Sequence, residues 1–312
     1  MKPLRVAIVG MGKIARDRHL PAIAANPAFK LAAVASPHHK HEGVPNFRSL
    51  EVLLREVPDI DVVAICTSPQ ARYDVAWHAL NHRKHVMLEK PPGATLSEVQ
   101  SLVELAERQN IALFAAWHSR EAAAVQSARG WLATRHVRKV KVFWKEDVRI
   151  GHPGQAWIWK AGGLGVFDPG INALSVLTAI VPGTVMLREA TLSFPSNCET
   201  PIAAQLLLND EHGAAIEVEL DFLQAGPQTW DIAVETDAGR LLLSKGCSAM
   251  YVDGNSIIQS SDHEYPRLYA HFEKLVRERR IDVDIAPLRL VADAFLNGRR
   301  VTVAPFVDSL VP

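Results

Sequence analysis

The sequence predicts an α/β protein in two parts. A parallel sheet covered by helices comes first, and an α+β part with an open, largely antiparallel sheet follows. Its first third alternates short apolar runs with longer amphipathic segments, which is typical of βαβ units. After residue 118, segments with one apolar and one polar face dominate. Because 312 residues exceed the usual size of one domain, we expect two domains, residues 1–118 and 119–312.

The elements of the first part follow from runs that are apolar on both faces, which suit strands covered by helices on both sides. We expect strands at residues 4–9, 30–35, 62–67, 85–88 and 111–116. Helices are expected at residues 20–25, 50–56, 70–81 and 96–109. Thr95 precedes the last helix, and Glu98 follows three residues later, which predicts a capping box.

The second part begins with an expected helix at residues 121–133, and strands then dominate. The clearest strand, 216–222, alternates apolar and acidic residues, so it has one face in water. Further strands are expected at residues 140–144, 188–194, 203–208, 230–236 and 241–243. Helices return at residues 268–279 and 287–297, the second closed by Gly298, and the pattern leaves open whether this tail packs back on the first domain.

Composition and charge exclude several classes of protein. The chain has 34 basic and 34 acidic residues, so it lacks the positive charge of a nucleic-acid binder or a polybasic membrane-surface protein. Three widely spaced cysteines without a C-x-x-C motif indicate neither a metal site nor a disulfide framework. With no apolar run of membrane-spanning length, we expect a cytoplasmic protein whose partners are small molecules or other proteins.

A glycine-rich turn directly follows the first expected strand, with the sequence Gly10-Met11-Gly12-Lys13-Ile14-Ala15. In a G-x-G-x-x-A turn the first glycine permits the tight turn, and the second lets the backbone approach a pyrophosphate. The helix that follows would donate N–H groups to the phosphates. The first domain is therefore predicted to be a Rossmann dinucleotide-binding domain; the alternative is an ordinary glycine turn.

The end of the second strand decides between NAD and NADP, because an acidic residue there binds the ribose 2′-hydroxyl and repels a 2′-phosphate. This chain has no carboxylate at that position and offers Ser36, His38, His39 and Lys40 as donors. We therefore expect NADP or NAD as cofactor, with NADP slightly favoured. The alternative is a polar surface loop without a ligand. Further cofactor contacts are expected from Lys13, Ile14, Thr67, Glu89 and Lys90.

Three motifs carry a resemblance to a known family: the glycine turn at residues 10–15, Glu89-Lys90-Pro91, and Asp168-Pro169-Gly170-Ile171-Asn172. The chain resembles the glucose-fructose oxidoreductase and inositol dehydrogenase family over nearly its whole length. Within that family, residues 117–119, 144–148, 152–155 and 163–174 look like those of bacterial L-arabinose or D-galactose 1-dehydrogenases. The resemblance implies oxidation of an aldopyranose at C1 to the aldonolactone with NAD or NADP.

Oxidation at C1 requires a base near O1, a donor for the developing oxyanion and a sugar held with its C1–H toward the nicotinamide. Lys90 follows a parallel strand, where ligands of open α/β sheets bind, and we expect it to orient O1. The alternative is a solvated surface lysine.

Asp168 and Asn172 are four residues apart, so a helix would place them on one face. The wider family has a histidine as proton acceptor where this chain has Asn172, and asparagine cannot accept that proton. We therefore assign the base role to Asp168 and expect Asn172 to donate to the sugar. Local sequence favours equally a plain helix N-cap at Asp168, because Pro169 suits the first helical position.

The resemblance implies Glu146 and His152 as ligands of the sugar hydroxyls, with His118, Trp157 and Trp159 as possible polar or stacking contacts. Taken alone, these residue types are more often surface or core residues. Two alternatives remain open: a non-catalytic sensor that binds dinucleotide and sugar, and a relative that recycles a tightly held cofactor. An apolar outer face on the open sheet would predict a homodimer.

Overall fold

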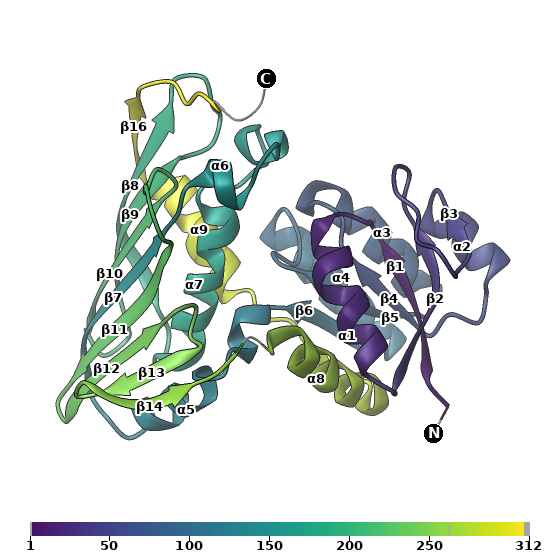
Figure 1. The fold of residues 1–312 in the computed structure, drawn as a ribbon, viewed down its shortest axis with the longest axis horizontal. Helices are drawn as coiled ribbons and strands as arrows, with labels where there is room; N and C mark the ends of the chain where they lie inside the picture. Colours follow the sequence, from purple (N-terminus) through teal and green to yellow (C-terminus); the bar gives the residue numbers. More distant parts are fainter. Residues whose placement is uncertain (1, 262, 309–312) are drawn as a thin grey trace. The chain divides into compact units, whose positions relative to one another are not determined.

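The computed structural model describes residues 2–261 and 263–308, which form two compact units. Within the described residues, the first unit comprises 2–118 and 263–285, and the second comprises 119–261 and 286–308. The expected second domain, 119–312, is therefore interrupted, because residues 263–285 return to the first unit. Figure 1 shows these residues as the yellow-green helix α8 beside the purple helix α1.

The first unit contains a parallel sheet in the order β15-β6-β5-β4-β1-β2-β3. This order places the carboxyl ends of β1 and β4 side by side, where a Rossmann fold binds its ligand. The parallel sheet predicted from the apolar runs is thus confirmed. The bounds are β1 Leu4–Val9, β2 Phe29–Ala35, β3 Asn46–Phe47, β4 Val62–Ile65, β5 His85–Glu89, β6 Leu113–Ala116 and β15 Ile281–Asp282.

Helices cover both faces of this sheet (Figure 1). One face packs on α2 (Leu50–Glu56), α3 (Pro69–Asn81) and α4 (Leu96–Gln109), which begins with the predicted Thr95 capping box. The other face packs on α1 (Leu20–Ala25) and α8 (Glu264–Glu278). A π-helical segment, Ala15–His19, leads into α1. Pro21 accounts for this irregularity, because its ring removes the N–H that would bond to Asp17.

The second unit is built on a mixed sheet in the order β14-β13-β12-β11-β7-β10-β9-β8-β16. Neighbours are antiparallel except for the β10–β7 and β16–β8 pairs. The sequence missed the short strands β13, β14 and β16. The bounds are β7 Val137–Lys145, β8 Met186–Pro195, β9 Ala203–Asn209, β10 Ala215–Asp221, β11 Thr229–Thr236, β12 Gly239–Ser244, β13 Ala249–Val252, β14 Asn255–Gln259 and β16 Arg299–Val303.

Helices of the second unit lie on one side of this sheet (Figure 1). They are α5 (Val125–Leu132), the short α6 (Val148–Gly151), α7 (Phe167–Ile180) and α9 (Ala286–Asn297). The expected helix at 121–133 was too long, because residues His118–Glu121 form a separate 3₁₀ turn. A second 3₁₀ turn spans Ala156–Trp159.

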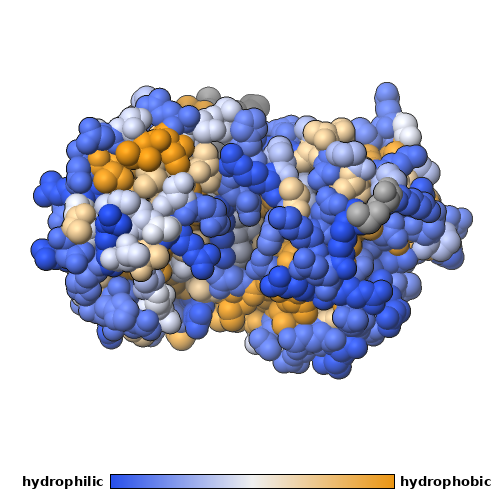
Figure 2. Space-filling view, turned by 90° about the horizontal axis from the view of Figure 1, so that it is seen from below, coloured by the Kyte–Doolittle hydropathy of each residue, from blue (hydrophilic) through white to orange (hydrophobic). Residues whose placement is uncertain are grey.

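The opposite side of the sheet is charged. Nζ of Lys139 lies 2.5 Å from Oε1 of Glu217. Nζ of Lys145 lies 2.6 Å from Oε1 of Glu219. The apolar outer face that would have predicted a homodimer is therefore not found along β7 and β10, and oligomerisation stays a prediction. Figure 2 shows a largely hydrophilic surface in its view, with apolar residues gathered in a few groups, the clearest at the lower centre and the upper left. No helix among the described residues is long and apolar enough to cross a membrane.

Candidate functional site

The glycine turn forms a cradle at the end of β1. Gly10 has φ +90°, and a Cβ there would lie 2.9 Å from the backbone carbon of Cys66. A Cβ on Gly12 would meet nothing within 4 Å. Next to Gly10, where a Cβ would lie 3.0 Å from the backbone nitrogen of Thr67, the buried hydroxyl of Thr67 has no hydrogen-bond partner. The open volume at Gly12 and the vacant Thr67 hydroxyl fit a dinucleotide, because its pyrophosphate and ribose need close backbone approach and polar partners.

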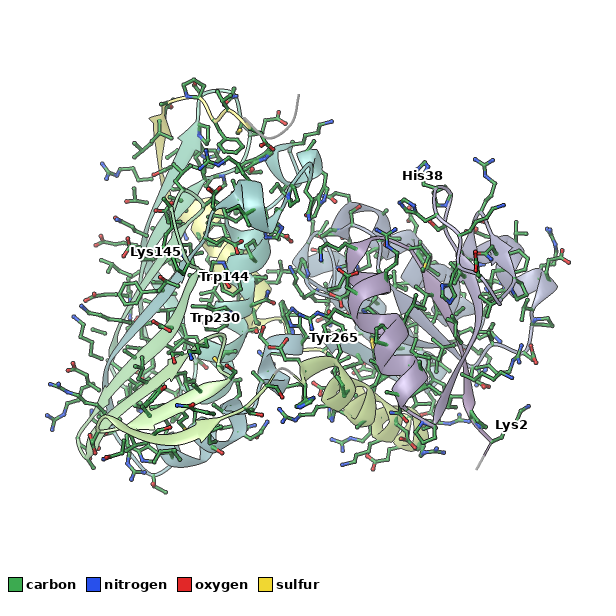
Figure 3. The ribbon with its side chains drawn as sticks, viewed as in Figure 1. Lys2, His38, Trp144, Lys145, Trp230 and Tyr265 are labelled. Atoms are coloured by element: carbon green, nitrogen blue, oxygen red, sulfur yellow. The ribbon has the colours of Figure 1, made fainter. Side chains whose placement is uncertain are left out.

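The loop after β2 carries the expected 2′-phosphate donors. His38 is exposed at the tip of this loop (Figure 3), and the backbone N–H of His39 donates to the Ser36 hydroxyl at 3.3 Å. Lys13 is also exposed and pairs with Asp17. Ile14 instead packs against the core of the unit, so its contribution to a cofactor site would be structural.

Glu89 and Lys90 lie where β5 ends. Glu89 is buried, and its carboxylate accepts hydrogen bonds from His19 Nε2 at 2.9 Å, from the Tyr265 hydroxyl at 2.6 Å and from the backbone N–H of Lys90 at 3.0 Å. Burial by itself would raise the pKa of Glu89. The hydrogen bond and charge of His19, with smaller effects of His118 and Tyr265, lower it to about 2.

Helix α7 carries Asp168 and Asn172. Val166 is its N-cap, and Asp168 lies within the first turn, so the N-cap alternative for Asp168 is wrong. Gly170 allows this turn to pack closely on β10, because a Cβ at this position would lie 2.7 Å from Cδ1 of Leu220. Both polar side chains are buried, and Oδ1 of Asn172 has no hydrogen-bond partner. Such an orphaned acceptor indicates a place for a ligand hydroxyl.

Glu146 follows the last residue of β7 and is buried. Its two oxygens bond to His152 Nε2 at 3.0 Å and to the side-chain amide of Gln228 at 2.9 Å. The predicted pair Glu146 and His152 is thus joined directly, and Gln228 is a third member that the sequence did not reveal.

Trp144 lies next to Glu146 along the chain and faces the helices. Leu220 and Trp230 are its register partners on the two neighbouring strands, so the three residues form one row across the sheet. Because Gly170 of α7 lies on Leu220, Trp144 is one strand away from the turn that carries Asp168. The buried indole N–H of Trp144 has no partner. Figure 3 shows Trp144 and Trp230 on the helix side and Lys145 on the opposite side.

A cavity of about 480 Å³ lies in the second unit. His152 and Trp159 line it together with Glu199, Asn197 and Phe306. The indole of Trp159 contacts the rings of Phe222 and Phe306, at centroid distances of 5.8 and 4.9 Å. Glu146, Asp168 and Asn172 are not among the described residues that line this cavity. His118, in the first unit, bonds to Glu264 at 2.6 Å and stacks on Tyr265.

Comparisons with known proteins show the family of the chain. Residues 4–116 match the family model described as an oxidoreductase family with an NAD-binding Rossmann fold, GFO/IDH/MocA. The chain is 44% identical over 308 residues to galactose 1-dehydrogenase of Pseudomonas fluorescens, covering 99% of this chain and 100% of that protein. The chain belongs to the GFO/IDH/MocA family.

Solved structures of the GFO/IDH/MocA fold extend this result. The structure of D-galactose-1-dehydrogenase from Rhizobium etli has a TM-score of 0.95 and 51% identity, covering 98% of this chain and 99% of that one. A 3-ketoreductase from Actinomadura kijaniata, solved with NADP, has a TM-score of 0.85 at 17% identity, covering 96% and 99% of the two chains, and shows the fold alone. The predicted family, the oxidoreductase class and the nicotinamide dinucleotide cofactor are confirmed.

Besides Gln228, the sequence of this GFO/IDH/MocA protein did not reveal the residues that hold Glu89. Arg72 is buried, and its Nη1 donates to the carbonyl of Glu89 at 2.6 Å. His19 and Tyr265 bond to the carboxylate of the same residue. Their partners are far away in sequence, so no local pattern indicates these contacts. Only His19 gave a signal in the sequence, because a polar residue on an apolar helix face indicates a buried polar contact.

Proposed function

We propose that the protein is an NAD(P)-dependent aldose 1-dehydrogenase that oxidises C1 of an aldopyranose such as D-galactose or L-arabinose to the aldonolactone. The full-length similarity to two galactose 1-dehydrogenases carries this proposal. When bound, NAD(P)⁺ would supply the acceptor for the hydride of C1. The residues of the chain must then hold the sugar and remove the proton of its C1 hydroxyl.

The glycine cradle would hold the cofactor. Gly10 and Gly12 would bring the backbone against the pyrophosphate, and the hydroxyl of Thr67 would bond to the bound nucleotide. The loop from Ser36 to Lys40 would accept a 2′-phosphate, since it presents donors and no carboxylate. NADP is therefore favoured over NAD.

Asp168 acts as the base. It is a buried carboxylate on the first turn of α7, held in place by the close contact of Gly170 with Leu220. Asn172 lies one helical turn further and cannot take up a proton, so its amide bonds to a sugar hydroxyl. Lys90 orients O1 and stabilises the negative charge that develops as the proton leaves.

The other hydroxyls of the sugar are bound in the second unit. Glu146 can accept from one hydroxyl while His152 and Gln228 fix its carboxylate. The unpartnered indole N–H of Trp144 supplies a donor near α7. Trp159 supplies an apolar ring face of the kind that sugar sites use. His118, which already bonds to Glu264, is the weakest of the proposed sugar contacts.

Initial rates of NAD(P)H formation over a panel of aldoses, each with NAD⁺ and with NADP⁺, test this proposal. We expect turnover with D-galactose, L-arabinose or D-fucose, which share a pyranose and differ chiefly at C5, and a lactone as product. A sensor, or an enzyme that recycles a bound cofactor, would bind these ligands without steady reduction of free cofactor. Absence of turnover with every aldose would contradict the proposal.

A further inference from the structure

A buried polar cluster lies directly before Lys90 in the first unit. It consists of His19, Glu89, Tyr265 and Tyr269, which we call the Glu89 cluster. Their exposed fractions are 0%, 3%, 3% and 0%. Burying charged groups costs free energy, and an apolar core of equal volume is often at least as stable. The Glu89 cluster therefore calls for an explanation beyond stability.

The hydrogen bonds of the Glu89 cluster converge on one carboxylate. Oε1 of Glu89 accepts from both His19 and Tyr265, while Oε2 accepts from the backbone N–H of Lys90. The other nitrogen of His19 bonds to the Tyr269 hydroxyl at 2.8 Å. The carboxylate thus connects helix α8 to the backbone of Lys90.

A second buried group binds the same segment. The guanidinium of Arg72 donates to the carbonyl oxygens of Glu89, Pro91 and Thr67. The backbone on both sides of Lys90 is therefore fixed by hydrogen bonds. Little freedom remains for the Cα of Lys90, from which its side chain extends.

We propose that Tyr265 is a positioning residue for Lys90, acting through the Glu89 carboxylate. The inference rests on the proposed function, in which the Lys90 ammonium orients O1 of the sugar. A shift of about 1 Å in a reacting group can cost about 100-fold in rate, so a donor that fixes the Lys90 backbone affects catalysis without touching substrate. Because Tyr265 belongs to α8, a late segment of the chain completes the site of the first unit.

Tyr265→Phe is the sharpest test, because it removes one hydroxyl and keeps the ring that packs on His19 and His118. We expect kcat to fall by about 10-fold to 100-fold, with the dissociation constant of NADP and the melting temperature nearly unchanged. Tyr73→Phe is the matched control, because its hydroxyl bonds to Ser101 between α3 and α4. The control should keep wild-type kcat.

The pH profile separates positioning from a structural role. His19, Cys66, Tyr269, His118 and Glu264 are the titratable groups around Glu89 and Tyr265. Tyr265 is one of the donors that lower the pKa of Glu89, so protonation of Glu89 should begin to reduce kcat at a higher pH in Tyr265→Phe than in the wild type. Tyr269→Phe, one hydrogen bond further from Lys90, should show the same changes to a smaller extent and serves if Tyr265→Phe does not fold.

Unchanged kcat and an unchanged pH profile in Tyr265→Phe would overturn the positioning role. A fall in kcat accompanied by an equal loss of NADP binding would also overturn it, because that pattern indicates general damage to the unit. Lys90→Met tests the underlying function separately. Full turnover in Lys90→Met would contradict the role of Lys90 itself, whatever Tyr265→Phe shows.

Discussion

The Tyr265 hydroxyl donates a 2.6 Å hydrogen bond to Oε1 of Glu89, across a separation of 176 residues in the sequence. Through this bond a helix that follows the second sheet becomes part of the dinucleotide-binding unit. Burial alone would lower the pKa of His19, but the neighbouring Cys66, Tyr269 and Glu89 raise it well above its usual value. The hydrogen bond between His19 and Glu89 favours the charged form of both side chains.

Glu89→Gln should destabilise the protein by about 3–5 kcal/mol at pH 7, because it leaves the buried His19 without its counter-ion. The pKa of Glu89 is lower in the folded protein than in the unfolded chain, so its contribution is present above pH 4.5 and is lost as the pH falls toward about 2. The measurement is the free energy of unfolding in urea, and its difference between the wild type and the variant should shrink as the pH falls over this range. A constant difference would contradict the assigned pKa shift.

The pKa of His19 is higher in the folded protein, which gives the opposite dependence. Its contribution is complete below pH 6.5 and is lost as the pH rises through the raised pKa. We therefore expect wild-type stability to decline on the alkaline side, and His19→Gln to remove that decline. The measurement is the free energy of unfolding in urea from pH 6 upward, and an identical alkaline decline in both proteins would contradict the assignment.

Gly10→Ala and Gly12→Ala should differ in a way that reports the bound dinucleotide. A Cβ at Gly10 collides with the backbone of Cys66 and Thr67, so both melting temperature and NADP affinity should fall. A Cβ at Gly12 meets no protein atom within 4 Å, so the melting temperature should stay while NADP affinity falls by more than about tenfold. The measurement is the NADP affinity by calorimetry. An affinity in Gly12→Ala equal to that of the wild type would contradict a pyrophosphate site at Gly12.

Ser36→Asp should shift cofactor preference. A carboxylate just after β2 accepts from a ribose 2′-hydroxyl and repels a 2′-phosphate, so the ratio of kcat/KM for NAD⁺ over NADP⁺ should rise by about tenfold or more. Ser49→Asp makes the same chemical change at the N-cap of α2 and should leave the ratio unchanged. An equal ratio in both variants would contradict a 2′-phosphate site at this loop.

Gly170→Ala tests how closely α7 must pack. The added Cβ would lie 2.7 Å from Leu220 Cδ1, and overpacking of this kind costs about 1–3 kcal/mol. Turnover should fall because Asp168 and Asn172 move with the helix, and a second change, Leu220→Val, should restore part of it. Gly130→Ala on α5, where a Cβ meets nothing, should not reduce turnover. No recovery in the double variant would argue against this contact as the cause.

The sequence predicted the fold where it contained a clear apolar run or a clear apolar periodicity. Strands β1 and β4 and helices α2 and α4 follow from local pattern, as does the capping box at Thr95. Two-residue strands such as β3 and β15 carry no period to detect. The return of α8 to the first unit could not be predicted either, because an amphipathic helix matches any apolar face.

In the candidate site too, local sequence patterns could be predicted and contacts between distant segments could not. Motifs indicated Gly10, Lys90 and Asp168, since each belongs to a short segment with a recognisable spacing. Gln228 and Arg72 were missed because their contacts join segments far apart in the chain. The N-cap alternative for Asp168 was wrong because the helix begins earlier, at Phe167.

Asp168→Asn tests the central claim most directly. The substitution keeps the shape of the side chain and removes its ability to accept a proton, so kcat for D-galactose or L-arabinose should fall by about 10²-fold to 10⁴-fold while NADP affinity is retained. Asp293→Asn, on α9 of the same unit, should keep wild-type kcat and serves as the control. Wild-type turnover in Asp168→Asn would contradict the assignment of Asp168 as the base.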